Sequence, residues 1–155
     1  MIDNIQVLVQ RLPHSEGLPL PEYKSEHAAG MDVCAALDGP LEVQPGERAL
    51  LPTGLKVAIP PGFEIQVRPR SGLALKQGLA VLNSPGTIDA DYRGEIKIIL
   101  ANLGQESVTL SRGDRVAQLV MCRAPAIDWR EVEALDDTLR AEGGFGHTGV
   151  NGQSG

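Results

Sequence analysis

The chain has 155 residues, enough for one domain with an apolar core and too few to predict two. Its net charge of −6 and pI near 5.0 argue against direct nucleic-acid binding, because proteins of that class need a basic face. No stretch approaches the roughly 18 apolar residues of a membrane span and the N-terminus lacks the features of a signal peptide, so we expect a cytoplasmic protein with no membrane contact.

Short runs of alternating apolar and polar residues recur along the chain, separated by glycines and prolines. A period of two, with turns about every ten residues, is typical of an all-β sandwich or barrel. We therefore predict strands at residues 5–10, 55–59, 63–67, 95–100 and 115–121. Cys34 and Cys122 lie in apolar runs without CxxC spacing, which predicts buried free thiols.

One short stretch, Ser71 to Gln77, predicts a helix, with Ser71 as a candidate cap. The basic sequence RPRSG at 68–72 leads into it. This sequence has two interpretations: an anion site at the start of the helix, or a capped helix beside surface arginines. It is not a P-loop, because no GK[ST] follows.

Two further turns carry polar residues next to predicted strands. Asp32 follows a glycine at a strand entry, where an ordinary turn aspartate is the simpler interpretation. In GDRVAQ at 113–118, the first two residues predict a turn. Gln118 then shares a strand face with Val116 and Val120, where its amide needs a hydrogen-bond partner.

The C-terminal part of the chain is harder to interpret. Trp129, Val132, Leu135 and Leu139 recur at nearly helical spacing, but the first two also favour a strand, so residues 128–139 remain open between helix and strand. The glycine-dense end that follows cannot bury enough surface to offset its ordering entropy. It is either a flexible end or a clamp, with Arg140 binding phosphate and Phe145 stacking on a base.

Five stretches together resemble, in order and spacing, the motifs of the trimeric deoxyuridine triphosphate pyrophosphatases (dUTPases). They are AGMD at 29–32, RSGLALKQG at 70–78, NSPGTIDADYRGE at 83–95, GDRVAQ at 113–118 and RAEGGFGHTG at 140–149. The resemblance covers nearly the whole chain. It implies a jelly-roll-like β-barrel over residues 1–139, a homotrimer with active sites shared between subunits, and a flexible tail, 140–155, that closes over the site. It also favours a strand over a helix for 128–139.

The implied reaction is hydrolysis of dUTP to dUMP and pyrophosphate with Mg²⁺ bound to the triphosphate, which limits uracil incorporation into DNA and supplies dUMP for thymidylate synthesis. Asp89 would hold the attacking water, Asn83 would read the uracil edge in a narrow hairpin, and Tyr92 would lie under the deoxyribose. Asp32 would touch Mg²⁺ through water. The other residues implied to contact the nucleotide are Arg70, Ser71, Gly72, Gly86, Thr87, Ile88, Gln118, Arg140, Phe145, Gly146, His147 and Thr148.

Departures from the family pattern are few. Ala141 stands where many members have glycine, and His147 where many have serine. Arg93 and Glu95 match the third motif without an implied catalytic role, and we interpret them as hairpin or interface residues.

Two rival functions follow from the same residues. A related dCTP deaminase shares the barrel and trimer, but its second motif continues with a serine and an arginine where this chain has Gly72 and Lys76, and no residue here matches its catalytic glutamate. The presence of Asp89, Tyr92, Gln118 and Phe145 together argues against a non-catalytic nucleotide-binding or regulatory trimer. Pyrophosphate release from dUTP separates the three.

Overall fold

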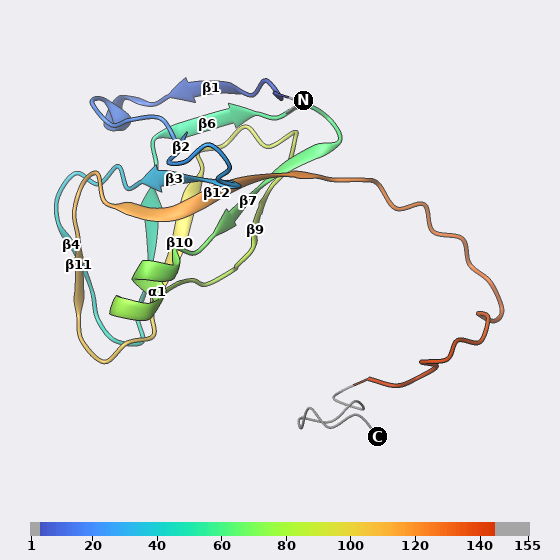
Figure 1. The fold of residues 1–155 in the computed structure, drawn as a ribbon. Coiled ribbons are helices and arrows are strands. Elements are labelled where there is room, and N and C mark those ends of the chain that lie inside the picture. Colours follow the sequence, from blue (N-terminus) through green and yellow to red (C-terminus); the bar gives the residue numbers. More distant parts are fainter. Residues whose placement is uncertain (1–3, 145–155) are drawn as a thin grey trace.

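The computed structural model describes residues 4–144, and strands dominate its secondary structure (Figure 1). In order, the elements are β1 (Leu8–Arg11), η1 (Pro13–Ser15, a 3-10 turn), β2 (Glu22–Tyr23), β3 (Gly30–Cys34), β4 (Leu41–Val43), β5 (Arg48–Pro52), β6 (Leu55–Ala58), β7 (Phe63–Arg68), α1 (Ser71–Gln77), β8 (Leu79–Val81), β9 (Gly86–Ile88), β10 (Lys97–Asn102), β11 (Val108–Leu110) and β12 (Arg115–Arg123). The expectation of a mostly β fold with one short helix is confirmed for this part of the chain.

All five strands predicted from the alternating pattern form, with shifted ends. The largest shift at a functional motif is in β10, which begins at Lys97 although the alternation begins at Glu95. Ile96 instead donates its backbone N–H to the Leu55 carbonyl at 2.8 Å, and the Glu95 carboxylate accepts the Gly54 N–H. These two residues are therefore attached to the β5–β6 turn before the strand starts.

Antiparallel pairing arranges the strands in four sheets. The orders are β2-β3-β12-β7-β9, β5-β10-β8, β1-β6 and β11-β4. The long strand β12 lies at the centre of the five-stranded sheet, with Gln118 opposite Asp32 of β3 on one side and Arg68 of β7 on the other. This register brings the first, second and fourth motifs together.

The four sheets share one apolar core, to which each contributes inward-facing side chains. Alternation in β10 buries Ile98 and Leu100, and Val33, Val43 and Leu55 come from the other three sheets. Burying a side chain of this size stabilises the fold by about 1.5–3 kcal/mol. The described strands do not continue from sheet to sheet as one ladder, so they are not closed into the barrel that we expected. Packing across the core holds the sheets together instead.

Two local details differ from the sequence-based expectations. The N-cap of α1 is Arg70, without a side-chain hydrogen bond, and Ser71 is the first helical residue. Cys34 and Cys122 are free thiols but only half-buried. Within residues 4–144 no helix has the length and apolar character needed to cross a membrane.

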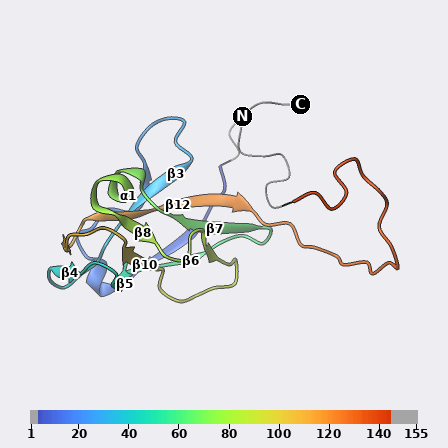
Figure 2. The same cartoon turned by 90° about the horizontal axis from the view of Figure 1, so that it is seen from below.

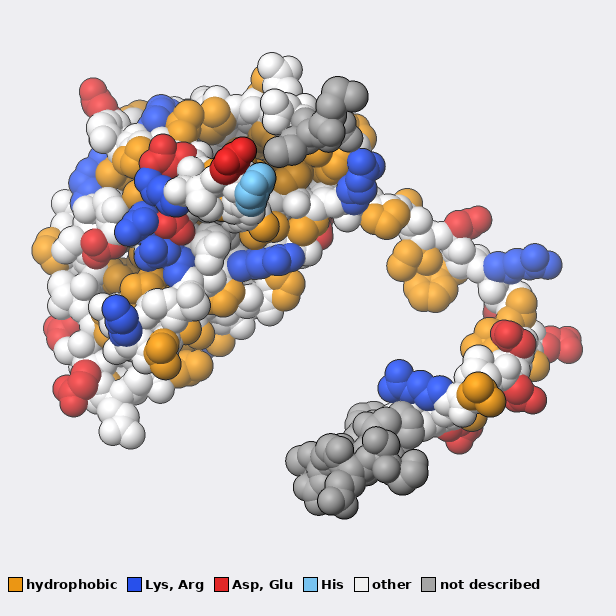
Figure 3. Space-filling view, viewed as in Figure 1, with side chains coloured by type: hydrophobic (Ala, Val, Ile, Leu, Met, Phe, Trp, Pro, Cys, Tyr) orange, Lys and Arg blue, Asp and Glu red, His pale blue; other side chains and the backbone are white. Residues whose placement is uncertain are grey.

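Residues 124–144, which we name the arm, leave the sheets at the end of β12 (Figures 1 and 2) and contain neither helix nor strand. Both alternatives for 128–139, including the favoured strand, are therefore wrong for this single chain. Trp129 is 86% exposed and Leu135 is 85% exposed. Figure 3 shows apolar side chains of the arm lying away from the body of the molecule. A strand needs a neighbour for its hydrogen bonds and an amphipathic helix needs an apolar surface. Only Ala124, at the start of the arm, donates its N–H to the body, at the Gly62 carbonyl, and the other backbone hydrogen bonds of the described arm are local.

Candidate active site

The carboxylate of Asp32 lies between two arginines. Its Oδ1 accepts a hydrogen bond from Arg70 Nε at 3.1 Å, and its Oδ2 accepts one from Arg115 Nη1 at 2.9 Å. Arg70 Nη1 also donates to the Arg115 carbonyl at 2.9 Å. Asp32 lies inside β3 and its side chain is 14% exposed, so it is not the turn aspartate of the simpler interpretation. One carboxylate here offsets two positive charges, which leaves a net positive group with free N–H donors for an anion.

Gln118 has the partner that its place on a buried strand face requires. Its Nε2 donates to the Pro69 carbonyl at 3.2 Å. A Cβ atom at Gly30 would lie 2.6 Å from Gln118 Oε1, so a larger residue at this position would displace the amide. The Pro69 carbonyl thus orients the amide of the fourth motif next to the second motif, and Gly30 leaves room for it.

A cavity of about 710 Å³ lies where the first and fourth motifs meet the start of the third, beside the end of β7 that leads into the second motif. Its lining residues are Ala28, Ala29, Gly30, Gln66, Arg68, Pro69, Ser84, Pro85, Gln118 and Val120. Asn83 precedes this lining and packs against Gly86, at which a Cβ would lie 3.1 Å from Asn83 Nδ2. Asp89 and Tyr92 do not line the cavity.

The third motif does not form the expected hairpin, because its two ends lie in different sheets. β9 pairs with β7, with Thr87 opposite Gln66 and Ile88 opposite Ile65, whereas β10 lies between β5 and β8. Between them, the Tyr92 N–H donates to the Asp89 carbonyl at 3.1 Å. Asp89 itself is exposed. The motif is therefore a crossover segment that presents Asp89 to solvent.

Glu95, at the end of this crossover, has a partner that the sequence analysis missed. His14 Nε2 lies 2.6 Å from Glu95 Oε1, and the Gly54 N–H donates to the same oxygen at 2.8 Å. Burial opposes ionisation of Glu95, but these hydrogen bonds outweigh burial, so the pKa of this carboxyl lies below its ordinary value. His14 and Glu95 are 81 positions apart, and no sequence pattern connects them.

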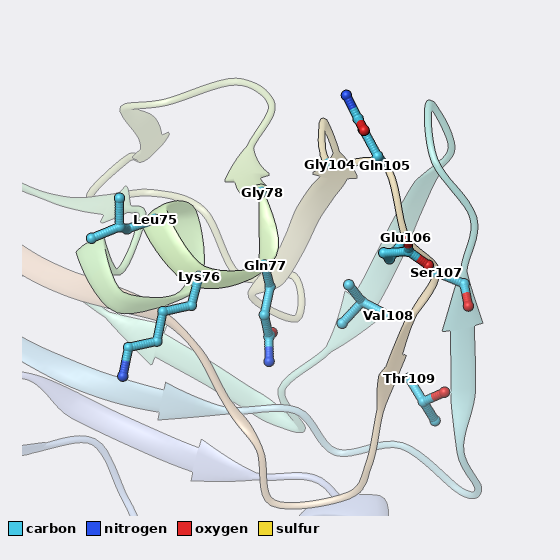
Figure 4. Close-up of a pocket in the computed structure, with 10 residues that line it drawn as sticks. All are labelled: Leu75, Lys76, Gln77, Gly78, Gly104, Gln105, Glu106, Ser107, Val108 and Thr109. Atoms are coloured by element: carbon cyan, nitrogen blue, oxygen red, sulfur yellow. The ribbon is translucent and has the colours of Figure 1, made fainter.

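Two other hollows contain none of the predicted site residues. A pocket of about 490 Å³ lies between the C-terminal end of α1 and the segment leading into β11 (Figure 4), with Lys76, Gln77, Glu106 and Val108 among its lining residues. A larger groove of about 880 Å³ is mostly apolar and includes Val9, Tyr23, Met31 and Met121. Neither matches the chemistry of a triphosphate site.

The fifth motif is described only in part. Arg140 is exposed and its Nε donates to the Gly143 carbonyl at 2.9 Å. Phe145, Gly146, His147 and Thr148 lie outside the described residues. Among residues 4–144, no group of three or more His, Cys, Asp and Glu side chains could hold a metal ion.

Comparisons with known proteins agree with the five motifs. A family model described as dUTPase matches residues 16–149. A variant of the Staphylococcus bacteriophage 80alpha dUTPase, solved with dUpNHpp, is similar with a TM-score of 0.84 and 26% identity over 94% of this chain and 99% of that chain. The 80alpha dUTPase with dUPNHPP has a TM-score of 0.80 and 28% identity over 94% of this chain and 99% of that chain. A variant dUTPase of phage phi11 of S. aureus is described as coordinating a structural Mg(II) ion. It has a TM-score of 0.75 and 25% identity over 85% of this chain and 99% of that chain.

Proposed function

The chain belongs to the dUTPase family, and from this premise we propose how its own residues bind and hydrolyse dUTP. As a dUTP diphosphatase it converts dUTP and water to dUMP and pyrophosphate. Use of Mg²⁺, limitation of uracil incorporation into DNA and supply of dUMP for thymidylate synthesis are typical of the family. The observation that carries the residue assignment is the pair of arginines on Asp32, because a triphosphate needs clustered, oriented positive charge.

The phosphates are assigned to Arg70, Ser71, Gly72 and Gln118. Arg70 keeps free guanidinium donors while Asp32 and the Arg115 carbonyl fix its orientation. Gln118 donates to Pro69 through Nε2, and an amide nitrogen has a second hydrogen for a ligand. Phosphoryl chemistry depends mainly on positioning and on neutralising charge, and this set of residues supplies both.

Asp32 fits an indirect contact with Mg²⁺. Each of its oxygens already accepts one guanidinium hydrogen bond, and a carboxylate oxygen can accept one more, from a metal-bound water. Mg²⁺ usually keeps several waters and binds phosphate oxygens, which agrees with the lack of a metal-ligand cluster in residues 4–144. When bound, the ion neutralises charge on the triphosphate.

The nucleoside is assigned to the third motif. Asn83 and the backbone of Gly86, Thr87 and Ile88 bind the uracil edge, and Tyr92 packs against the deoxyribose where a 2′-hydroxyl would stand. Asp89 orients a water toward the α-phosphorus and accepts its proton as the new P–O bond forms. The bond from the α-phosphorus to the bridging oxygen then breaks, and pyrophosphate leaves. Asp89 is exposed, and a carboxylate oriented toward a water is a suitable general base.

We infer that the active unit is a homotrimer in which sites are shared between subunits. Two observations support this proposal. Asp89 and Tyr92 do not line the cavity beside Gln118, which supports a site completed by a second chain. The arm also exposes apolar side chains such as Trp129 and Leu135, which need a surface on another chain. Residues 1–139 then form the folded domain, and the tail from Arg140 closes over the site.

The test is an assay of pyrophosphate release with dUTP, dTTP, UTP and dCTP in Mg²⁺ buffer. We expect dUTP to have the highest kcat/KM, with the other three far behind. Ammonia release from dCTP would instead indicate a deaminase. A protein that binds dUTP and releases no pyrophosphate would overturn the proposed function.

A further inference from the structure

The crossover segment at residues 89–95 pairs with no described strand. Hydrogen bonds within the segment hold its conformation instead. Arg93 Nη1 donates to two backbone carbonyls, that of Ala90 at 2.7 Å and that of Tyr92 at 2.9 Å. The Tyr92 N–H donates to the Asp89 carbonyl. One exposed guanidinium therefore bridges the peptide units that separate Asp89 from Tyr92.

The other end of the segment is also fixed. Tyr92 Oη donates to the Glu95 carbonyl at 2.9 Å, and the ring lies over Gly94, where a Cβ would overlap the phenol. Glu95 is in turn anchored by the Gly54 N–H and by His14. His14 belongs to η1, whose carbonyls are held by Arg112, which donates to His14 O at 2.8 Å and to Glu16 O at 2.7 Å. The Glu95 end of the segment is thus attached to the body. At the Asp89 end, the side-chain hydrogen bonds within the described residues come from Arg93.

Arg93, like the exposed Arg11, Arg112 and Arg140, donates to backbone carbonyls. No carboxylate of the described residues pairs with it in an ion pair, and both bonds of Nη1 end on carbonyls of its own segment. Holding a long side chain in one conformation costs rotamer entropy, and hydrogen bonds from a charged donor are about twice as strong as neutral ones. The arrangement orders the segment before any ligand arrives.

We propose that Arg93 is a positioning residue that fixes Tyr92 relative to Asp89 and thereby sets discrimination between deoxyribose and ribose. This inference rests on the proposed function, in which Tyr92 packs against the sugar and Asp89 holds the water. In this proposal Arg93 contacts neither the sugar nor the attacking water. It acts through the backbone of residues 90–92.

The test measures equilibrium binding of dUMP and UMP together with kcat/KM for dUTP and UTP. The variants are Arg93→Ala, Arg93→Lys and, as a matched control that also removes one exposed arginine, Arg48→Ala on β5. Loss of typical hydrogen bonds predicts a two- to tenfold fall in the dUMP-over-UMP affinity ratio for Arg93→Ala, roughly matched by the dUTP-over-UTP ratio. Lysine carries three donors, so Arg93→Lys should keep most of the discrimination. The melting temperature of all three variants should match the parent, because Arg93 is exposed.

Unchanged ratios in Arg93→Ala would overturn the inference. A rise in KM for dUTP with an unchanged dUMP-over-UMP affinity ratio would also overturn it, because that result would indicate that Arg93 binds the phosphates directly. An unmodified protein that releases no pyrophosphate from dUTP would instead sink the proposed function. The binding ratios of the monophosphates would still decide the positioning role, so the two failures are distinct.

Discussion

Arg115 Nη1 lies 2.9 Å from Asp32 Oδ2, while Arg70 occupies the other oxygen of the same carboxylate. Because Arg115 also accepts a hydrogen bond from Arg70 through its carbonyl, the two arginines and the aspartate orient one another. Arg115 stands in the fourth motif, but the sequence analysis gave it no role. Its side chain is 48% exposed, so its removal should leave the fold intact.

We predict that Arg115→Ala raises KM for dUTP by roughly tenfold and lowers kcat less, because a charge-assisted bond that orients a phosphate-binding arginine is lost. Steady-state kinetics in Mg²⁺ buffer measures both constants. Arg123→Ala, which removes an exposed arginine at the far end of the same strand, is the matched control. An Arg115→Ala protein with parental KM would show that Asp32 and the backbone carbonyl of residue 115 suffice to hold Arg70.

Replacing Tyr92 by alanine should relax discrimination against UTP more than discrimination against dTTP. The phenol is the group assigned to exclude a 2′-hydroxyl, whereas the uracil edge and its 5-position are assigned to the backbone near Asn83. The measurement is kcat/KM for the three nucleotides in parent and variant. A larger gain for dTTP than for UTP would reverse the assignment of the two halves of the pocket.

Asp89→Asn keeps the size of the side chain and a hydrogen bond but removes the base. We expect kcat to fall by about 10²–10⁴-fold, the usual loss for a general base, while dUpNHpp still binds. Because Asp89 is exposed, we expect the variant to fold like the parent, and a melting curve checks this. Turnover within a few-fold of the parent would identify a different residue as the base.

We predict that the free energy of unfolding depends on pH through the Glu95 carboxyl. Its pKa in the folded protein is below the ordinary value, because hydrogen bonds from His14 and Gly54 outweigh the opposing effect of burial. The folded state therefore binds fewer protons here than the unfolded chain, so this group stabilises the protein above its unfolded pKa of about 4.3. That stability is lost as pH falls through the folded pKa.

Glu95→Gln should remove this part of the acid dependence. Urea midpoints measured at fixed protein concentration between about pH 7 and pH 3 should fall less steeply in the variant than in the parent. Glu42→Gln, at an exposed position of β4, should follow the parental curve. Parallel curves for parent and Glu95→Gln would contradict the role of the His14 contact.

The strands and α1 could be predicted because their signals are local. Alternation over five or six residues fixes which side chains enter the core, and Gly78 ends the helix in a left-handed conformation with φ of 67°. The Asp32–Arg115 and His14–Glu95 pairs could not be predicted. The first pair is separated by 83 positions in the sequence and the second by 81. Such pairs depend on strand register and on how one sheet packs against another.

The arm fails prediction for a different reason. Trp129, Val132 and Leu135 carry the apolar spacing of a buried element, but none of the three is buried within this chain. Secondary structure in such a segment is set by the surface that covers it, and the pattern alone does not identify that surface. The five motifs, by contrast, predicted the family because their order and spacing are properties of the sequence alone.

The shared active site is the central claim, and mixing two inactive proteins tests it most directly. One protein ends after Leu139, which leaves β1–β12 intact and removes Arg140 and Phe145; the other is full-length Asp89→Asn. If Asp89 and the tail of one site come from different subunits, about one site in four of a random equimolar trimer mixture should regain both. We therefore predict that the co-refolded mixture recovers roughly a quarter of parental pyrophosphate release from dUTP, and that the same proteins mixed without refolding do not. Mixed trimers that form and remain inactive would contradict the shared-site account.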